Sequence, residues 1–159
     1  MSVAFTKEED SEAQAAHLPD RPISPHPNLV TPEGLAQIEA ALAEAKAAYA
    51  SAQAAGDVKG DRTAMARATR ELRYYAARRA SAQLVEPPAS PERVGFGTTV
   101  SLEREDGRTQ RFRIVGEDEA DPAKGSVSYI SPLASALLGK EIGDVANVAG
   151  HEVEVTGIA

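Results

Sequence analysis

The strongest constraint in this sequence is an apolar repeat with alternating steps of three and four residues, which continues on both sides of a glycine-bracketed turn. This spacing is typical of a coiled-coil seam, which is narrower than the apolar face of an ordinary globular helix. The turn between the two runs is Gly56–Asp61. Two seamed helices joined by a short turn can fold back on each other, so we expect an antiparallel helical hairpin. The repeating positions are Leu35, Ile38, Leu42, Ala45, Tyr49 and Ala52 before the turn, and Met65, Ala68, Leu72 and Tyr75 after it.

The ends of both helices are also indicated by the sequence. Thr31 can cap the free amides of the first helix, and Pro32 is favoured at the first helical position. We expect this helix to continue to about Ala55. The second helix is expected to begin at Asp61 or Thr63 and to end near residue 84, before the Pro87-Pro88 pair. The predicted hairpin therefore spans residues 30–86.

Composition favours one small domain joined to an extended element. Aromatic residues are only 4% of the 159 residues and Trp is absent, so the first half cannot build a large core. The chain has no Cys, which excludes a disulfide framework, a thiolate zinc site and a cysteine nucleophile. Its apolar runs are too short to span a bilayer, and the first ten residues are acidic rather than like a signal peptide. We expect a soluble protein that is located in the cytoplasm.

Charge is distributed unevenly. The net charge of −7 argues against a general nucleic-acid binder, yet the second predicted helix holds one acid, Glu71, among six arginines. Two interpretations stay open. The arginines form a solvated face paired with Glu39 and Glu44, or they contact a phosphate backbone or an acidic channel wall. The arginines are Arg62, Arg67, Arg70, Arg73, Arg78 and Arg79.

Two segments resemble neither helix nor strand. Residues 1–29 are acidic and proline-rich, and they have too little apolar surface to order themselves, so we expect a disordered tail. Residues 87–93 combine Pro, Ser and charge, and we interpret them as a linker. The apolar period changes from about 3.5 to 2 beyond this linker, which marks a domain boundary.

Residues 94–159 predict a small α+β domain. Alternating segments at 99–103 and 111–115 flank Asp106-Gly107, a strong hairpin signal. A third strand is expected at 126–130, and two further strands at 145–148 and 151–158. Ser131, Pro132 and Gly139 bracket a short apolar helix that we expect to cross an antiparallel sheet.

No self-contained active site is visible in the sequence. The acidic loop 117–121 lacks the alternating ligands and the closing glutamate of an EF-hand. The chain has no glycine-rich phosphate loop, no pair of His at metal spacing and no serine elbow. His151 is expected on a strand edge as a surface residue. We therefore do not expect an enzyme.

Several spaced blocks in the second half resemble the C-terminal domain of the bacterial GreA/GreB transcript cleavage factors. The blocks are Arg113–Asp121, Ser131-Pro132, Ala136–Lys140 and Gly143-Asp144-Val145, and they occur in the family's order within residues 94–158. The segment Thr31–Leu35 is similar to the start of the family's coiled coil. The resemblance implies a molecule of two parts that acts on RNA polymerase. One part is a C-terminal FKBP-like domain, and the other is a coiled coil.

The resemblance also implies roles for particular residues. Ser131, Pro132 and Leu133 would dock at the mouth of the secondary channel of RNA polymerase, and the hairpin would enter that channel. Asp57 and Asp61 at the tip would help the polymerase's own acids to hold a second Mg²⁺ and to orient the water that cleaves backtracked RNA. Arg67, Arg70 and Arg73 would meet the extruded RNA 3′ end. The chain itself would hold no cofactor and at most stimulate the cleavage activity of the polymerase.

Two departures from the family pattern keep another role open. The family tip resembles Gly-Asp-Leu-Lys-Glu-Asn, whereas here Gly60 stands where the second acid would be and Asp61 follows one place later. Each helix is also roughly one heptad shorter than in the family, about 10 Å of reach. Either the docking position is shifted, or the protein occupies the channel as a non-cleaving inhibitor or modulator of RNA polymerase, and both this role and cleavage stay open.

Two further alternatives come from other functional classes. A peptidyl-prolyl isomerase would use the same fold but needs an apolar pocket lined by several aromatic residues, and this domain offers only Phe96, Phe112 and Tyr129. An interaction module without a polymerase role is the other alternative. Neither a membrane nor a small-molecule substrate is expected as a partner.

Overall fold

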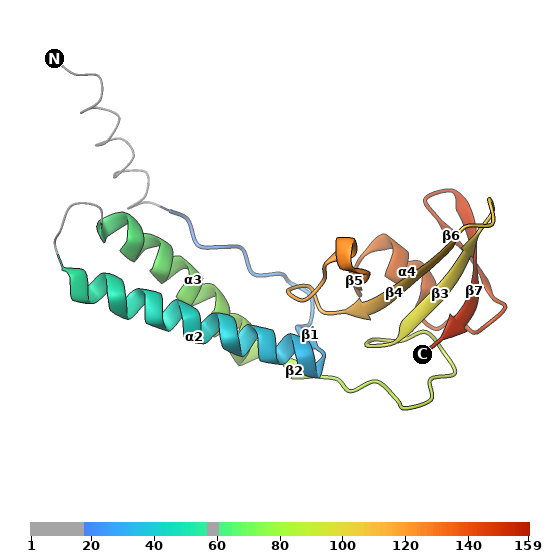
Figure 1. The fold of residues 1–159 in the computed structure, drawn as a ribbon, viewed down its shortest axis with the longest axis horizontal. Helices are drawn as coiled ribbons and strands as arrows, with labels where there is room; N and C mark the ends of the chain where they lie inside the picture. Colours follow the sequence, from blue (N-terminus) through green and yellow to red (C-terminus); the bar gives the residue numbers. More distant parts are fainter. Residues whose placement is uncertain (1–17, 57–60) are drawn as a thin grey trace, which may run out of the picture. The chain divides into compact units, whose positions relative to one another are not determined.

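In the computed structural model of the chain, residues 18–56 and 61–159 are described, and they divide into two compact units (Figure 1). The first unit comprises residues 18–27 and 37–81, and the second comprises residues 28–36 and 82–159. Helix α2 (Pro32–Ala55) begins in the second unit and continues in the first. Each unit is described by itself below.

The first unit is built on an antiparallel pair of helices, α2 and α3 (Asp61–Ser81). Arg79 near the end of α3 forms an ion pair of 3.0 Å with Glu39 near the start of α2. At the other end of the pair, Ala52 near the end of α2 and Met65 near the start of α3 line one cavity. Figure 1 shows the two helices side by side along their length. The predicted hairpin is thus confirmed for the described residues.

The seam predicted from the apolar repeat is the contact between these helices. Ile38, Ala45, Ala52 and Ala68 are at most 7% exposed, and the other seam positions are half-buried. Alanine at three of the four buried positions allows the backbones to approach closely. Because no aromatic residue is fully buried here, the stabilisation comes from a narrow line of contacts rather than from a broad core.

Both ends of the hairpin helices show how local sequence sets their limits. The hydroxyl of Thr31 accepts a hydrogen bond of 3.0 Å from the amide of Gly34, as the predicted cap requires. The other end differs from the prediction, because α3 stops at Ser81 rather than near residue 84. Residues 83–84 form strand β2 (Gln83–Leu84), which pairs in parallel with β1 (Leu29–Val30). In this pairing the Gln83 and Val85 amides donate to the Asn28 and Val30 carbonyls, so they are not available for a further helical turn.

The second unit contains a five-stranded sheet in the order β5-β4-β3-β7-β6. Its strands are β3 (Thr99–Arg104), β4 (Thr109–Val115), β5 (Ser126–Ser128), β6 (Val145–Val148) and β7 (His151–Ile158). The turn between β3 and β4 lies at Gly107, whose φ of 82° is in the left-handed region. The predicted α+β class is confirmed.

One strand pair departs from the antiparallel sheet that the sequence predicts. Strand β5 is shorter than expected and runs parallel to β4, with Ile114 opposite Val127. The intervening loop carries the chain back through the 3-10 turn η1 (Pro122–Lys124), so β5 starts at the same end as its neighbour. The sheet is therefore mixed rather than purely antiparallel.

The short helix α4 (Pro132–Leu137) covers the core of this sheet. The Ser131 hydroxyl accepts a hydrogen bond of 3.2 Å from the Ala134 amide, which confirms the predicted cap. Ala134 and Leu137 are fully buried. They pack with Val94 and with the inward side chains of the strands, which are Val100, Leu102, Ile114, Val127, Ala146, Val153 and Val155.

Candidate functional site

The tip of the hairpin is defined by its two flanking helices. Helix α2 ends at Ala55, and Gly56 follows with a φ of 71°, a conformation that glycine adopts without strain. Asp57 lies outside the described residues. Asp61 is the first residue of α3, but its side chain is not among those described. The predicted roles of both carboxylates therefore stay predictions.

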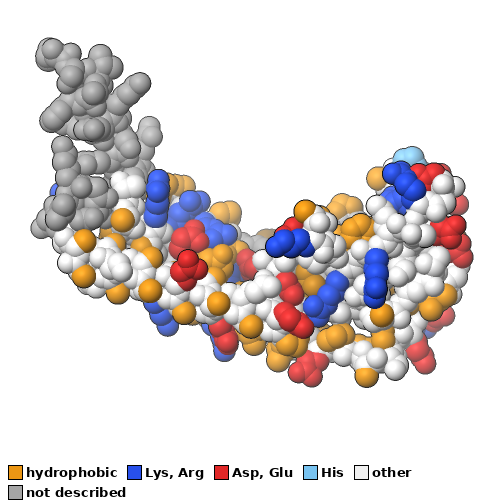
Figure 2. All heavy atoms as spheres, viewed as in Figure 1, with side chains coloured by type: hydrophobic (Ala, Val, Ile, Leu, Met, Phe, Trp, Pro, Cys, Tyr) orange, Lys and Arg blue, Asp and Glu red, His pale blue; other side chains and the backbone are white. Residues whose placement is uncertain are grey.

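The three arginines predicted to meet RNA do not share one surface. Arg70 and Arg73 line a cavity of about 540 Å³, together with Arg62. Arg67 instead lines a separate cavity of about 380 Å³, whose other lining residues include Glu44 and Glu71. In Figure 2, blue side chains gather along the side of the hairpin where Figure 1 draws α3. The structure thus groups Arg70 with Arg73 and separates Arg67 from them.

The arginines of α3 differ in their partners. Arg79 pairs with Glu39, as the solvated-face interpretation expects. Arg73 pairs with Asp20 at 3.3 Å, and both side chains are about two-thirds exposed, at 67% and 64%. The Nε atom of Arg70 is buried and has no hydrogen-bond partner within the described part of the chain. A buried donor without a partner costs free energy, which makes Arg70 a candidate for contact with an anion.

A segment that the sequence places in the disordered tail packs on α3 instead. We call residues 18–27 the N-terminal strap. The guanidinium carbon of Arg21 lies 3.8 Å from the centroid of the Tyr74 ring, and its Nη1 lies 2.8 Å from a carboxylate oxygen of Glu71. Partial burial lowers the pKa of Arg21, but Tyr75 and Glu71 outweigh this effect and the pKa lies above its usual value. Within the predicted tail of residues 1–29, the strap therefore makes defined contacts with α3.

The strap is held by contacts that are individually weak. The Arg21–Glu71 and Arg73–Asp20 pairs are both partly solvated, and such pairs contribute about 0.2–1 kcal/mol each. A cation–π contact at a partly exposed site adds about 0.5–1 kcal/mol. Each of these contacts is thus weak by itself, and the strap depends on their combination.

The first turn of α2 is fixed to the sheet by a polar network inside the second unit. The hydroxyl of fully buried Thr31 donates a hydrogen bond of 2.6 Å to Glu119, whose side chain is only 9% exposed. Arg113 lies between two acids, 3.2 Å from Glu33 and 4.0 Å from Glu119. Hydrogen bonds from its own amide and from Arg113 lower the pKa of Glu33. Two of the segments that carry the family resemblance, Thr31–Leu35 and Arg113–Asp121, therefore contact each other here.

Two glycines allow the close approach that this network requires. A Cβ at residue 34 would lie 2.5 Å from the Glu119 carboxylate, and a Cβ at residue 116 would lie 2.3 Å from the Leu29 carbonyl oxygen. Both distances are far below van der Waals contact. Gly34 and Gly116 are thus needed because backbone and side chains approach them closely.

The residues predicted to dock on RNA polymerase lie at the start of α4. The Ser131 hydroxyl caps the helix, and Leu133 packs against the sheet core. Pro132 is the exposed member of the three. Leu138, Ile142 and Val145 are also exposed, at 38%, 63% and 52%, and they follow α4 in the chain. The docking role of Ser131, Pro132 and Leu133 stays a prediction.

The aromatic residues of the second unit belong to its packing. Phe112 and Tyr129 pack against the core, and Phe96 contacts Tyr129 edge to face with ring centroids 5.8 Å apart. An isomerase would instead need its aromatic side chains to line an open apolar pocket. This arrangement gives no support to the isomerase alternative.

Within residues 18–56 and 61–159, no group of three or more His, Asp or Glu residues could hold a metal ion. No helix within the same ranges is long and apolar enough to cross a membrane.

Comparison with known proteins agrees with this two-unit architecture of a helical hairpin and a C-terminal α+β domain. Residues 89–158 match the family model described as "Transcription elongation factor, GreA/GreB, C-term". The chain is 36% identical to transcription elongation factor GreA of Desulfovibrio desulfuricans over 80% of this chain and 83% of the relative. It is 40% identical to transcription elongation factor GreB of Pseudomonas aeruginosa over 72% of this chain and 77% of the relative.

The comparison with solved structures also returned a match. The GreA factor homolog 1 protein of Thermus thermophilus is 22% identical with a TM-score of 0.40, over 84% of this chain and 99% of that chain. The match to GreA over most of both chains identifies the family directly. The chain belongs to the GreA/GreB family of transcription elongation factors.

Proposed function

We propose that this chain is a bacterial RNA polymerase-binding elongation regulator that inserts its hairpin into the secondary channel and promotes cleavage of backtracked RNA. The observation that carries the proposal is the antiparallel pair α2 and α3, closed at Gly56 by a turn whose sequence contains two carboxylates. Family membership supports it, since relatives that match most of the chain are named transcription elongation factors. A cytoplasmic location is part of the proposal.

The proposed chemistry belongs to the polymerase, and the tip assists it. Asp57 and Asp61 would supply oxygen ligands to a second Mg²⁺ in the polymerase active site, because divalent magnesium prefers carboxylate and water ligands. Two metal ions can then stabilise the attacking and leaving oxygens of the RNA phosphate. On this proposal the chain is not itself an enzyme and holds no cofactor of its own.

The RNA contact is proposed chiefly for Arg70 and Arg73. Both line one cavity, whereas Arg67 lines another cavity together with two acids. A guanidinium forms paired hydrogen bonds with phosphate oxygens and keeps its charge at any physiological pH. Arg67 is proposed as a weaker contact because neighbouring Glu44 and Glu71 offset its charge.

Docking is proposed through residues 94–159, with Ser131, Pro132 and Leu133 at the contact. Pro132 is exposed and is fixed in orientation by the capped helix that follows it. Pro132→Ala is expected to weaken retention of the chain on immobilised RNA polymerase. Pro122→Ala is the matched control, because Pro122 is an exposed proline at the start of η1. Equal retention of both variants would contradict the docking role.

A second candidate function is occupation of the channel without cleavage. It is favoured by Gly60 in the place of the family's second acid and by helices of 24 and 21 residues, roughly 36 and 31 Å long. These are shorter than the family's helices by about one heptad each. In this function the hairpin would slow substrate entry instead of shortening the RNA.

A backtracked elongation complex from the source organism separates the two functions. If the chain promotes cleavage, added protein shortens the RNA, and Asp57→Asn and Asp61→Asn each reduce the rate at least about tenfold. Asp106→Asn is the matched control, since Asp106 also lies beside a glycine in a turn. Unchanged RNA length together with slower nucleotide addition would instead establish the channel-occupying function.

A further inference from the structure

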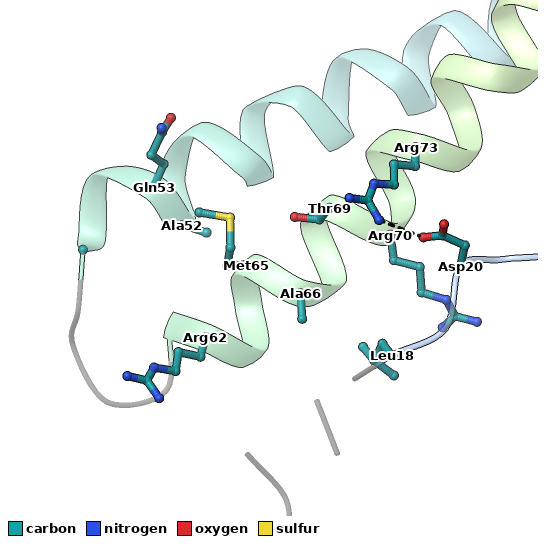
Figure 3. Close-up of a pocket in the computed structure, with 11 residues that line it drawn as sticks. Leu18, Asp20, Ala52, Gln53, Arg62, Met65, Ala66, Thr69, Arg70 and Arg73 are labelled. Carbon is teal, nitrogen blue, oxygen red and sulfur yellow. Dashed lines mark hydrogen bonds and ion pairs between the residues drawn. The ribbon is translucent and has the colours of Figure 1, made fainter. Parts of the chain in front are cut away.

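The cavity between the N-terminal strap and the hairpin is lined by more basic than acidic side chains among the described residues. It has a volume of about 540 Å³, within the range of small-ligand sites. In Figure 3, Leu18 and Asp20 of the strap lie beside Arg70 and Arg73 of α3, whereas Arg62 lies at the start of α3 and extends away from them. The described lining residues include three arginines and one carboxylate, so the charge of the cavity favours an anion.

The arginines of this cavity are only partly satisfied. The dashed contact in Figure 3 joins Arg73 to Asp20, at 3.3 Å. The buried Nε of Arg70 has no partner in the described part of the chain. The guanidinium groups of Arg70 and Arg73 therefore offer more N–H donors than the Asp20 carboxylate accepts.

The chemistry of these donors points to one ligand class. Guanidinium groups form paired, charge-assisted hydrogen bonds with phosphate oxygens, and phosphate offers more acceptor oxygens than one carboxylate. The hydroxyl of Thr69 offers a further donor, and the side chains of Met65 and Leu18 give the cavity an apolar part against which a ribose or base can pack. A phosphate attached to a nucleoside matches both halves of this lining.

We propose that the strap cavity binds a phosphate group of a nucleotide or RNA chain, and that Asp20 is a built-in competitor that the phosphate displaces from Arg73. The inference rests on the RNA contact proposed above for Arg70 and Arg73 and adds the strap as its regulator. The weak contacts of the strap make this exchange feasible, because an exposed Arg–Asp pair contributes little stabilisation.

The test uses the full chain without polymerase, so its result is independent of the channel function. Affinity for a short single-stranded RNA is measured by fluorescence anisotropy, and ATP is added as a competitor. Asp20→Asn is expected to tighten RNA binding about two- to fivefold, the value of one exposed ion pair. Arg73→Gln and Arg70→Gln are each expected to weaken binding at least about threefold and to reduce the salt slope by about 0.7.

The exposed pair Arg108–Asp106 of the β3–β4 turn supplies matched controls, because Asp106→Asn and Arg108→Gln change the same charges elsewhere. Both controls are expected to leave RNA affinity nearly unchanged. If ATP displaces the RNA, and the variants rank in the same order for ATP as for RNA, the site is assigned to free nucleotides. If ATP does not displace the RNA, the site is assigned to an RNA strand. If neither probe binds, or if Asp20→Asn and Asp106→Asn behave alike, the proposal is overturned. Failure of the channel function would appear separately, as unchanged RNA length and unchanged nucleotide addition in the backtracked elongation complex.

Discussion

The hydroxyl of Thr31 donates a hydrogen bond of 2.6 Å to Glu119, which lies 88 positions later in the chain. The same oxygen accepts the Gly34 amide and so caps α2. One side chain therefore starts the helix and joins it to the loop that follows β4. The first turn of α2 belongs to the second unit for this reason.

Thr31→Val is expected to destabilise the second unit by about 2 kcal/mol. The variant keeps the shape of the side chain but loses the helix cap and leaves the Glu119 carboxylate buried with one partner fewer. Urea unfolding followed through the NMR amide signals of Val100 and Ile114 measures the loss. Thr109→Val is the matched control at an exposed position of β4, where a change within about 0.5 kcal/mol is expected. Equal effects of the two variants would contradict the role of the network.

Gly116→Ala is expected to cost at least about 2 kcal/mol, because the new methyl group would lie 2.3 Å from the Leu29 carbonyl oxygen. That oxygen belongs to the backbone of β1, so it cannot move away by a rotamer change. Gly95→Ala is the control, since a Cβ there meets no atom within 4 Å. The same unfolding measurement compares them. A Gly116 variant as stable as the Gly95 variant would show that β1 does not approach β4 as closely as described.

The ion pair between Glu33 and Arg113 predicts a pH dependence with a definite sign. The lowered pKa of Glu33 means that its stabilisation is fully present above the ordinary glutamate pKa and is lost as the pH falls through the lowered value. Glu33→Gln is therefore expected to cost at most about 1 kcal/mol at neutral pH, since the side chain is largely exposed. The difference from wild type should shrink in acid when unfolding is measured across pH. A difference that grows on acidification would have the wrong sign.

Much of the fold follows from local sequence patterns. The three-and-four spacing predicts the seam positions, because residues at that spacing lie on one side of a helix and can be buried together. Thr31, Ser131 and the Asp106-Gly107 turn identified element ends, since each satisfies backbone groups within a few residues. These features depend on neighbours in the chain, and that is why sequence alone predicts them.

The features that sequence reasoning missed depend on partners far along the chain. The direction of β5 is set by the path of the loop before it, and the sequence of a three-residue strand does not indicate whether it pairs in parallel or antiparallel. The strap was interpreted as disordered because it is proline-rich and poor in apolar residues. Its order comes from Arg21, which contacts residues of α3 some fifty positions away. A lone arginine in a tail gives no indication of which ring or carboxylate it will meet.

Arg21→Ala is expected to release the strap while leaving the hairpin folded. The substitution removes both the contact with the Tyr74 ring and the ion pair with Glu71, which together contribute about 1–2 kcal/mol. Backbone order parameters of Ile23 and Ser24 should fall from about 0.85 to below about 0.6 in NMR relaxation measurements. Arg21→Lys should give an intermediate value, because an ammonium keeps the charge but loses the planar stacking of the guanidinium. Arg79→Ala is the control, since it breaks an exposed ion pair between α2 and α3 without touching the strap. Unchanged order parameters in the Arg21→Ala variant would mean that other contacts hold the strap. The proposal that phosphate displaces the strap because its contacts are weak would then be wrong.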